Sequence, residues 1–381
     1  MNRLFLGDNL RVLRENIADA SVDLIYLDPP FNSDTNYNFV ISAGSRKKKS
    51  ASVQAFTDKW IWGKNSDQEL AEINVKNQSL GTLLSALTQS LNRNGLAAYL
   101  VMMGVRLLEL RRVLKSSGSF YLHCDSSASS YLKVLLDSIF GSENFRSEIA
   151  WKRTSSHNDS RKWSHIHDTI FFYAGKGFTW NPVYLAHDPE YVKKFYRFED
   201  ERGRYRLHEI IRTASMGSRP NLVYTYNGYR PEWGWRQIRS KVEALDRANR
   251  IEWSSTGRPY LKRYLHEQKG TPCSSIWIDI PPLSHAAAEK LGYPTQKPLS
   301  LLERIICASS NIGDVVLDPF AGCGTAIHAA GMLGRRWIAV DFSRLAVDLI
   351  RRRVNEKFPD VAYDWIDTTS RLKARVNWRE N

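Results

Sequence analysis

The sequence predicts an α/β fold with a doubly wound parallel sheet. Two observations predict it. Short apolar and β-branched runs at 22–27 and 315–317 are typical of buried parallel strands. Apolar stretches of helical length at 96–114 and 127–140 alternate with such runs, as in βαβ units. We therefore expect residues 1–145 and 285–370 to combine into one catalytic domain.

The first strand, Val22 to Leu27, ends at Asp28, and ligands of open α/β sheets bind outside the carboxyl ends of strands. Pro29 and Pro30 remove backbone donors and fix the chain direction. The Asp28 carboxylate and the Pro29 carbonyl can then both accept hydrogen bonds from one exocyclic amino group. Phe31 offers a face for base stacking. A proline turn with Asp28 as a surface cap is the alternative interpretation.

The second strand continues into Asp318-Pro319-Phe320-Ala321-Gly322-Cys323-Gly324-Thr325 and then a predicted helix to Leu333. Gly322 and Gly324 allow a tight turn and a close backbone approach to a ligand. Another strand, 337–340, ends in Asp341. This acid lies near the spacing of about 20 residues at which a carboxylate reaches ribose hydroxyls.

The glycine pattern differs from that of a dinucleotide site. Ile327 stands where the dinucleotide fingerprint needs a third glycine. A cofactor with a nucleoside but no pyrophosphate is therefore favoured. The alternative is a glycine-rich turn without a ligand.

The middle of the chain is its basic part. Of 381 residues with a net charge of +14, residues 151–270 hold 23 Lys and Arg against 13 Asp and Glu. Aromatic residues such as Trp163, Trp180 and Trp233 are interleaved with these cations, which suits a nucleic-acid surface, although most of the aromatics are expected in the core. We predict a target-recognition region at 146–284 and a basic tail at 371–381.

Composition excludes several classes of protein. No apolar run approaches 18 residues, so no membrane span is expected. An acid at Asp8 comes too early for a secretory signal. Four scattered cysteines without a CxxC pair indicate neither a zinc site nor a disulfide framework, and suit a reducing cytoplasm.

Asp28-Pro29-Pro30-Phe31 together with the segment 318–325 resembles the bacterial and phage DNA amino-methyltransferases. The order of catalytic segment, variable region and cofactor segment is that of their β class. The resemblance continues through Leu6-Gly7-Asp8-Asn9, Phe120-Tyr121-Leu122-His123-Cys124-Asp125, His167-Asp168-Thr169-Ile170-Phe171-Phe172-Tyr173 and Pro294-Thr295-Gln296-Lys297-Pro298. It covers nearly the whole chain except about 41–80 and much of 175–275.

The resemblance implies a Rossmann-like, S-adenosylmethionine-dependent methyltransferase sheet with an inserted target-recognition region, in a bacterial or phage protein of the cytoplasm. It implies methyl transfer to the N6 of a flipped-out adenine in double-stranded DNA. Asp28 resembles the adenine enzymes, whereas serine is frequent there among N4-cytosine enzymes. N4-cytosine methylation remains the alternative, as does a non-catalytic DNA-binding protein with this fold. A cognate restriction endonuclease and a homodimer are left open as partners.

The resemblance also assigns the site residues. Asp28, Pro29, Pro30 and Phe31 form the catalytic set that holds the target base. The cofactor set is Asp8 at the adenine, Asp341 at the ribose, Thr295, Gln296 and Lys297 beside the methionine part, and Asp28, Asp318, Phe320, Gly322, Gly324 and Thr325. No metal is expected. His123-Cys124-Asp125 is interpreted as a strand end with incidental polar groups.

Overall fold

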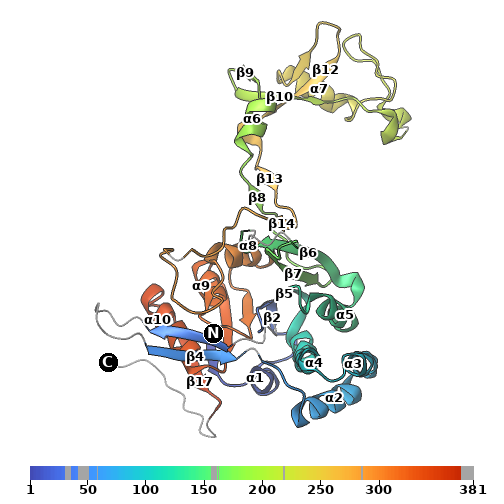
Figure 1. Cartoon of the computed structure of the whole chain (residues 1–381). Coiled ribbons are helices and arrows are strands. Elements are labelled where there is room, and N and C mark those ends of the chain that lie inside the picture. Colours follow the sequence, from blue (N-terminus) through green and yellow to red (C-terminus); the bar gives the residue numbers. More distant parts are fainter. Residues whose placement is uncertain are drawn as a thin grey trace. The chain divides into compact units, whose positions relative to one another are not determined.

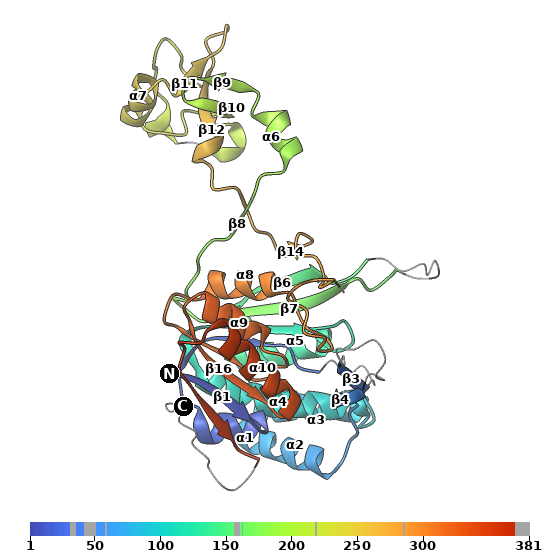
Figure 2. The same cartoon turned by 90° about the vertical axis from the view of Figure 1, so that its left-hand side faces the viewer.

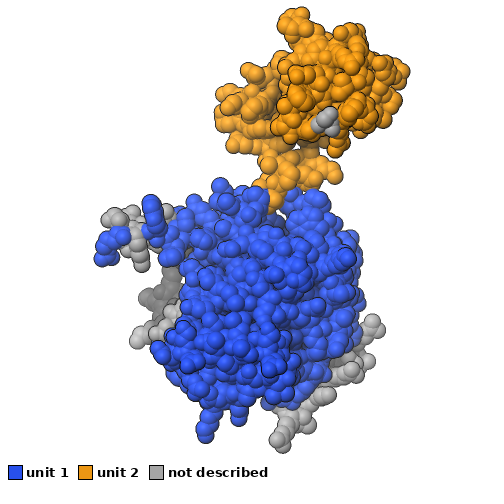
Figure 3. Space-filling model, turned by 90° about the vertical axis from the view of Figure 1, so that its right-hand side faces the viewer, with its two compact units in different colours: residues 1–183, 274–381 blue, residues 184–273 orange. Residues whose placement is uncertain are grey.

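The computed structural model describes residues 1–30, 59–155, 161, 163–217, 219–284 and 286–369, and the backbone of 36–41 and 51–57. Phe31 and the expected tail at 371–381 lie outside the described residues. The chain divides into two compact units, coloured separately in Figure 3. One unit comprises Met1–Val183 and Ser274–Asn381, and the other is Tyr184–Cys273.

The first unit, hereafter the sheet unit, is built on a nine-stranded sheet in the order β14-β6-β7-β5-β2-β15-β16-β1-β17 (Figure 1). The strands are β1 (Asn2–Leu6), β2 (Val22–Leu27), β5 (Leu114–Cys124), β6 (Phe145–Lys152), β7 (His167–Ala174), β14 (Ile276–Trp277), β15 (Val315–Asp318), β16 (Arg336–Asp341) and β17 (Tyr363–Asp367). Strand β7 is antiparallel to β5 and β6, and the other described pairs are parallel.

Helices cover both faces of this sheet, which confirms the predicted doubly wound fold (Figure 2). One face carries α1 (Asn9–Asn16), α4 (Gly95–Val113) and α5 (Ser129–Phe140), and the other carries α8 (Leu299–Ser309), α9 (Thr325–Met332) and α10 (Arg344–Lys357). Helices α2 (Lys64–Lys76) and α3 (Gln78–Ser90) pack on α4. Because α4 lies between them and the sheet, it is apolar and buried around most of its circumference.

Three short elements complete the sheet unit. Strands β3 (Asn36–Ile41) and β4 (Ala51–Thr57) form an antiparallel pair, and a 3-10 turn spans Ser142–Asn144. Among the helices in the described part of the chain, none is long and apolar enough to cross a membrane.

The second unit, hereafter the inserted unit, has an antiparallel sheet in the order β11-β12-β10-β9. Its elements are β8 (Tyr184–Leu185), α6 (Pro189–Phe195), β9 (Phe198–Asp200), β10 (Gly203–Glu209), α7 (Arg239–Arg247), β11 (Ile251–Trp253), β12 (Pro259–Tyr264), β13 (Thr271–Pro272) and 3-10 turns at Ala214–Met216, Pro220–Leu222 and Leu265–Glu267. Its core is small, and the buried members of one cluster are Ile210, Ile211, Trp235, Val242 and Ile251. Strands β8 and β13 pair where the chain enters and leaves this unit.

The inserted unit is shorter than the region expected at 146–284. Strands β6, β7 and β14 belong to the nine-stranded sheet, because β7 folds back beside β5 and β6 then pairs with β7. The boundaries of the compact unit are therefore 184 and 273.

Candidate functional site

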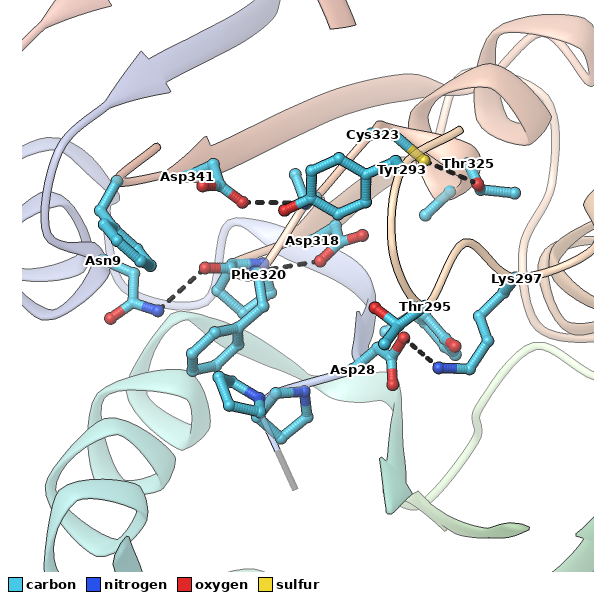
Figure 4. Close-up of a pocket in the computed structure, with 18 of the residues that line it drawn as sticks. Asn9, Asp28, Tyr293, Thr295, Lys297, Asp318, Phe320, Cys323, Thr325 and Asp341 are labelled. Carbon is cyan, nitrogen blue, oxygen red and sulfur yellow. Dashed lines mark hydrogen bonds and ion pairs between the residues drawn. The ribbon is translucent and has the colours of Figure 1, made fainter. Parts of the chain in front are cut away.

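The two motifs that lie far apart in the sequence end adjacent strands. Strands β2 and β15 are parallel neighbours, with Leu24 opposite Val316 and Ile25 opposite Leu317. Strand β16 follows β15 in the sheet. Asp28, Asp318 and Asp341 therefore lie at the same carboxyl edge of the sheet, where open α/β folds bind ligands (Figure 4).

A cavity of about 350 Å³ opens at this edge. Its volume is that of a small-molecule site, for which about 300–1,000 Å³ is usual. The expected site residues that line it are Asp8, Asp28, Pro29, Pro30, Thr295, Gln296, Lys297, Asp318, Phe320, Gly322, Thr325 and Asp341. Gly324 lies outside the lining and begins α9 instead.

Asp28 has one oxygen engaged and one available. Its Oδ2 accepts a hydrogen bond from the Lys297 ammonium at 2.5 Å (Figure 4). Its Oδ1 is buried and has no hydrogen-bond partner among the described residues. A buried carboxylate oxygen without a partner costs free energy, on the order of 1–3 kcal/mol, which a donor on a ligand would recover. This oxygen is thus an acceptor available to a ligand in the cavity.

Asp341 holds the glycine turn from the next strand. Its Oδ2 accepts from the Gly322 amide at 2.8 Å, and its Oδ1 accepts from the Ser343 amide at 2.8 Å. Burial raises the pKa of Asp341 to about 6. A carboxylate fixed by two backbone donors keeps further lone pairs for a hydroxyl group of a ligand.

The two glycines of the turn have different tasks. Gly322 lines the cavity at φ 52°, and a Cβ there would lie 3.3 Å from the Tyr293 ring. Gly324 precedes α9 at φ 76°, and a Cβ there would lie 2.8 Å from Ile350 Cγ1 on α10. Gly322 thus keeps the cavity open, whereas Gly324 lets the turn pack against α10.

Asp318 is buried between the other two carboxylates. It accepts a hydrogen bond from the Phe320 amide at 3.0 Å. Burial, reinforced by the negative charges of Asp28 and Asp341, raises the pKa of Asp318 well above its usual range. The turn after β15 is therefore held by a buried carboxyl group whose pKa is raised.

Arg106 is a site residue that the sequence did not reveal. From α4 it donates to Asp8 Oδ2 at 2.8 Å and to Asn9 Oδ1 at 2.7 Å, and Asn9 in turn donates to the Pro319 carbonyl at 2.9 Å. The network fixes the start of α1 against the turn after β15. Arg106 is the first charged residue after the uncharged run 95–105, and this was the available signal.

The segment 293–297 crosses the cavity. Tyr293 is buried and lines it, which the sequence did not indicate. Thr295 has φ 61°, a left-handed conformation that is strained for a β-branched residue. The Gln296 amide holds the turn by accepting from the Leu291 amide at 2.8 Å and donating to the Glu289 carbonyl at 2.7 Å. Gln296 therefore supports the strained turn that presents Lys297 to Asp28.

The chain is similar to known proteins over most of its length. The family model described as DNA methylase matches residues 22–352. The chain is similar to the type II methyltransferase M.EcaI of Enterobacter cloacae, at 34% identity over 265 residues, covering 68% of this chain and 57% of that protein. It is similar to the StyLTI Mod subunit, a type III restriction-modification enzyme of Salmonella typhimurium, at 30% identity, covering 86% of this chain and 49% of that protein.

A third relative is the DNA adenine methyltransferase YhdJ of Escherichia coli K12. The identity is 25% over 352 residues, covering 92% of this chain and 81% of that protein. The chain spans only about half the length of the first two relatives, 57% and 49%.

Proposed function

Because the chain belongs to the DNA methylase family defined by the model that matches residues 22–352, we propose that it is a site-specific DNA methyltransferase. It transfers a methyl group from S-adenosylmethionine to the exocyclic N6 of a flipped-out adenine. The observation that carries this proposal is the buried Asp28 Oδ1, which lacks a partner in the described structure and borders a cavity shared with Asp341.

The cavity fits the cofactor in its chemistry. The Asp341 carboxylate, held by the Gly322 and Ser343 amides, suits ribose hydroxyls. Ring faces at Phe320 and Phe342 suit an adenine, and both residues line the cavity. Asp8, fixed by Arg106, is placed to accept from the adenine amine.

When bound, S-adenosylmethionine supplies an electrophilic methyl carbon. The residues of this chain orient the acceptor. Asp28 Oδ1 and the Pro29 carbonyl accept the two hydrogens of the target amine, which turns its nitrogen lone pair toward the cofactor. Lys297 holds the second oxygen of Asp28, so the carboxylate cannot rotate away. Methyl transfer would form the N–C bond as the C–S bond of the sulfonium breaks, leaving a neutral thioether, and Asp28 Oδ1, hydrogen-bonded to the amine, would take up the surplus proton.

The inserted unit supports DNA as the substrate. It holds 18 Lys and Arg against 11 Asp and Glu. On β10, Arg204, Arg206 and His208 occupy alternate positions, and Arg263 on β12 lies opposite Arg206. These four residues are hereafter the basic face. Arg206 also donates to the Tyr191 hydroxyl and lies over the Tyr191 and Tyr196 rings.

The charges of the basic face repel each other. Burial and the charges of Arg263, Arg236 and Arg206 lower the pKa of His208. Like charges that lie directly opposite each other on neighbouring strands are destabilising, and a bound anion would relieve this repulsion. Phosphates of the DNA backbone are such anions. We therefore assign target recognition to the inserted unit.

Adenine is the proposed target base because YhdJ, which matches 92% of this chain, is named a DNA adenine methyltransferase. The motif residue Asp28 agrees with that assignment. Incubation of DNA with the protein and the cofactor, followed by mass spectrometry of the nucleosides, tests the function. We expect N6-methyladenine. N4-methylcytosine alone would reassign the target base, and no methylated base would refute the function.

Partner proteins are proposed by analogy with the relatives. A restriction-modification subunit among them supports a cognate restriction endonuclease as a partner. A homodimer is a further proposal, and sedimentation of the purified protein tests it. No disulfide joins Cys124, Cys273, Cys307 and Cys323 among the described residues, and the cytoplasm is the proposed location.

A further inference from the structure

One tryptophan of the sheet unit is almost fully exposed. The exposed fraction of Trp163 is 95%, the highest among the large hydrophobic side chains of the described residues. Trp163 lies between β6 and β7, in the part of the predicted recognition region that belongs to the sheet unit. A single exposed ring is common on protein surfaces and indicates little by itself. Its position in the fold decides what it can do.

Strand register places the start of β7 at the edge that carries Asp28. Leu27 pairs with Leu122 on β5, so Asp28, the next residue, comes level with His123. His123 in turn pairs with Ile170 on β7. Two strand spacings therefore separate Asp28 from β7, a distance on the order of 10 Å.

Trp163 lies beyond this edge, on the side from which a duplex must approach. Strand β7 begins at His167, four residues after Trp163, so the tryptophan lies past the end of the sheet. In the proposed reaction, the amine held by Asp28 belongs to a base that has left the duplex, and the duplex itself then lies outside the same edge. Trp163 and the gap left by that base thus face the same space.

The segment that carries Trp163 is anchored to the sheet unit at its base. The Ile166 carbonyl accepts a hydrogen bond from the Arg153 amide at 2.9 Å, which extends the pairing of β6 with β7. His165 Nδ1 lies 3.4 Å from Ser126 Oγ, in the turn after β5. The indole is therefore attached close to a fixed part of the catalytic edge.

The surroundings of the ring suit nucleic acid better than protein. The described neighbours Arg161, Ser164 and His165 are polar, whereas the core of a protein–protein interface is apolar and depleted in charge. Lys152 and Arg161 supply positive charge for backbone phosphates. A flat aromatic face beside cations is the combination that binds bases and backbone together.

We propose that Trp163 enters the gap that the target base leaves in the duplex and stacks on the neighbouring bases, which keeps the target base out of the stack. The proposal rests on the proposed methyl transfer to a flipped-out base. Apolar side chains inserted between base steps are a known means of holding DNA distorted. Trp163 is not among the described residues that line the cavity, so it is not placed to hold the flipped base itself.

The test uses a duplex with the recognised sequence, which sequencing of plasmid DNA methylated by the protein identifies. 2-Aminopurine replaces the target base, because its fluorescence rises when it leaves the stack. We expect a large rise at saturating wild-type protein and the loss of most of it with Trp163→Ala, although the DNA is still bound. Trp163→Phe should keep most of the rise, since a phenyl ring also stacks.

The unmodified duplex gives a second measurement. The single-turnover rate of Trp163→Ala at saturating DNA should fall about 5- to 150-fold, the range for the loss of one base–aromatic stack. Trp180→Ala is the matched control, because Trp180 is also exposed, at 51%, but follows β7 at the opposite edge of the sheet. Its rate and fluorescence should stay within about 2-fold of wild type. The thermal midpoint of Trp163→Ala should be that of the wild type, since the side chain is exposed.

A wild-type rate and fluorescence rise in Trp163→Ala would overturn the proposal. A brighter signal in this variant would also overturn it, because the indole would then be stacking on the flipped base. Altered sedimentation with unchanged fluorescence would assign the ring to a contact between copies of the chain instead. Failure of the proposed function is distinguishable, since the wild-type protein would then methylate no DNA.

Discussion

The sheet unit and the inserted unit place their functional groups in different ways. In the sheet unit, Asp28, Asp318 and Asp341 end neighbouring strands and converge on one cavity. In the inserted unit, the basic face is spread over alternate positions of β10 and one position of β12. Its residues do not line that cavity. The difference agrees with the proposed function, in which methyl transfer needs a few atoms at fixed points and contact with a long polyanion needs charge over a surface. Substitutions in the sheet unit should therefore impair methyl transfer or cofactor binding, and substitutions in the inserted unit should impair DNA binding.

The largest effect is expected at Asp28. Asp28→Ala removes the acceptor for the target amine, and we expect methyl transfer to fall about 1,000-fold or more, as for loss of the main orienting group of an active site. Cofactor affinity, measured by calorimetry, should change little. Asp348→Ala, a solvent-exposed acid on α10, is the control. Turnover near that of the control would remove Asp28 from the mechanism.

The next effect concerns the cofactor side of the cavity. Asp341→Asn should weaken cofactor binding about 10- to 150-fold, because a charged acceptor contributes about 1.5–3 kcal/mol. In the unsubstituted protein Asp341 has a pKa of about 6, so it is ionised above that pH and protonated below it. Affinity should therefore fall as the pH drops through about 6. The Asn variant should lack this pH dependence, and a persisting dependence would point to another group.

The basic face should alter DNA affinity rather than chemistry. Arg206→Gln combined with Arg263→Gln should weaken DNA binding about 10-fold and reduce the slope of log affinity against log salt by about 2. The single-turnover rate at saturating DNA should stay within about 2-fold, since no cavity residue is changed. Lys241→Gln with Arg247→Gln on α7 removes the same charge from exposed positions and serves as the control. Equal losses in both variants would mean that net charge alone binds DNA.

The smallest effect separates stability from function within one turn. Gly324→Ala forces a Cβ against Ile350 at positive φ, and should lower the free energy of unfolding by about 1–2 kcal/mol. Gly322→Ala carries the same positive-φ strain, but its Cβ meets the Tyr293 ring at 3.3 Å rather than Ile350 at 2.8 Å, so it should cost less stability and add a loss of cofactor binding. Thermal denaturation and calorimetry of both variants measure the two effects. A reversed pattern would contradict the division of tasks between the glycines.

The sequence predicted the strands at 22–27, 315–317 and 337–340, and the structure confirms them as β2, β15 and β16. These strands could be predicted because apolar runs and glycine turns depend on the local sequence. The positions of β6 and β7 in the sheet could not be predicted, because the antiparallel pairing of β7 with β5 and β6 depends on contacts between distant segments.

Pairings of polar side chains were equally hidden. His123 bonds Asp168 across a strand and Lys297 bonds Asp28 across 269 positions, and neither pair has a signature in the sequence. The Asp8–Arg106 contact is of the same kind. Such pairs are set by strand order, which periodicity does not encode.

The adjacency of β2 and β15 also has a consequence for the order of synthesis. The pairing of residue 24 with residue 316 on one side of β2 can form only after residue 316 has been synthesised. The pairing of β1 with β16 is delayed in the same way. At ribosomal speeds of about 5–20 residues per second, the delay is on the order of 15 to 60 seconds. During that time one edge of β2, the strand before Asp28, is unpaired. The residues that line the proposed cofactor side of the cavity have not yet been synthesised. The proposed site is therefore incomplete in a nascent chain until Asp318 and Asp341 have been synthesised, and the early strands are the segments that chaperones would have to shield.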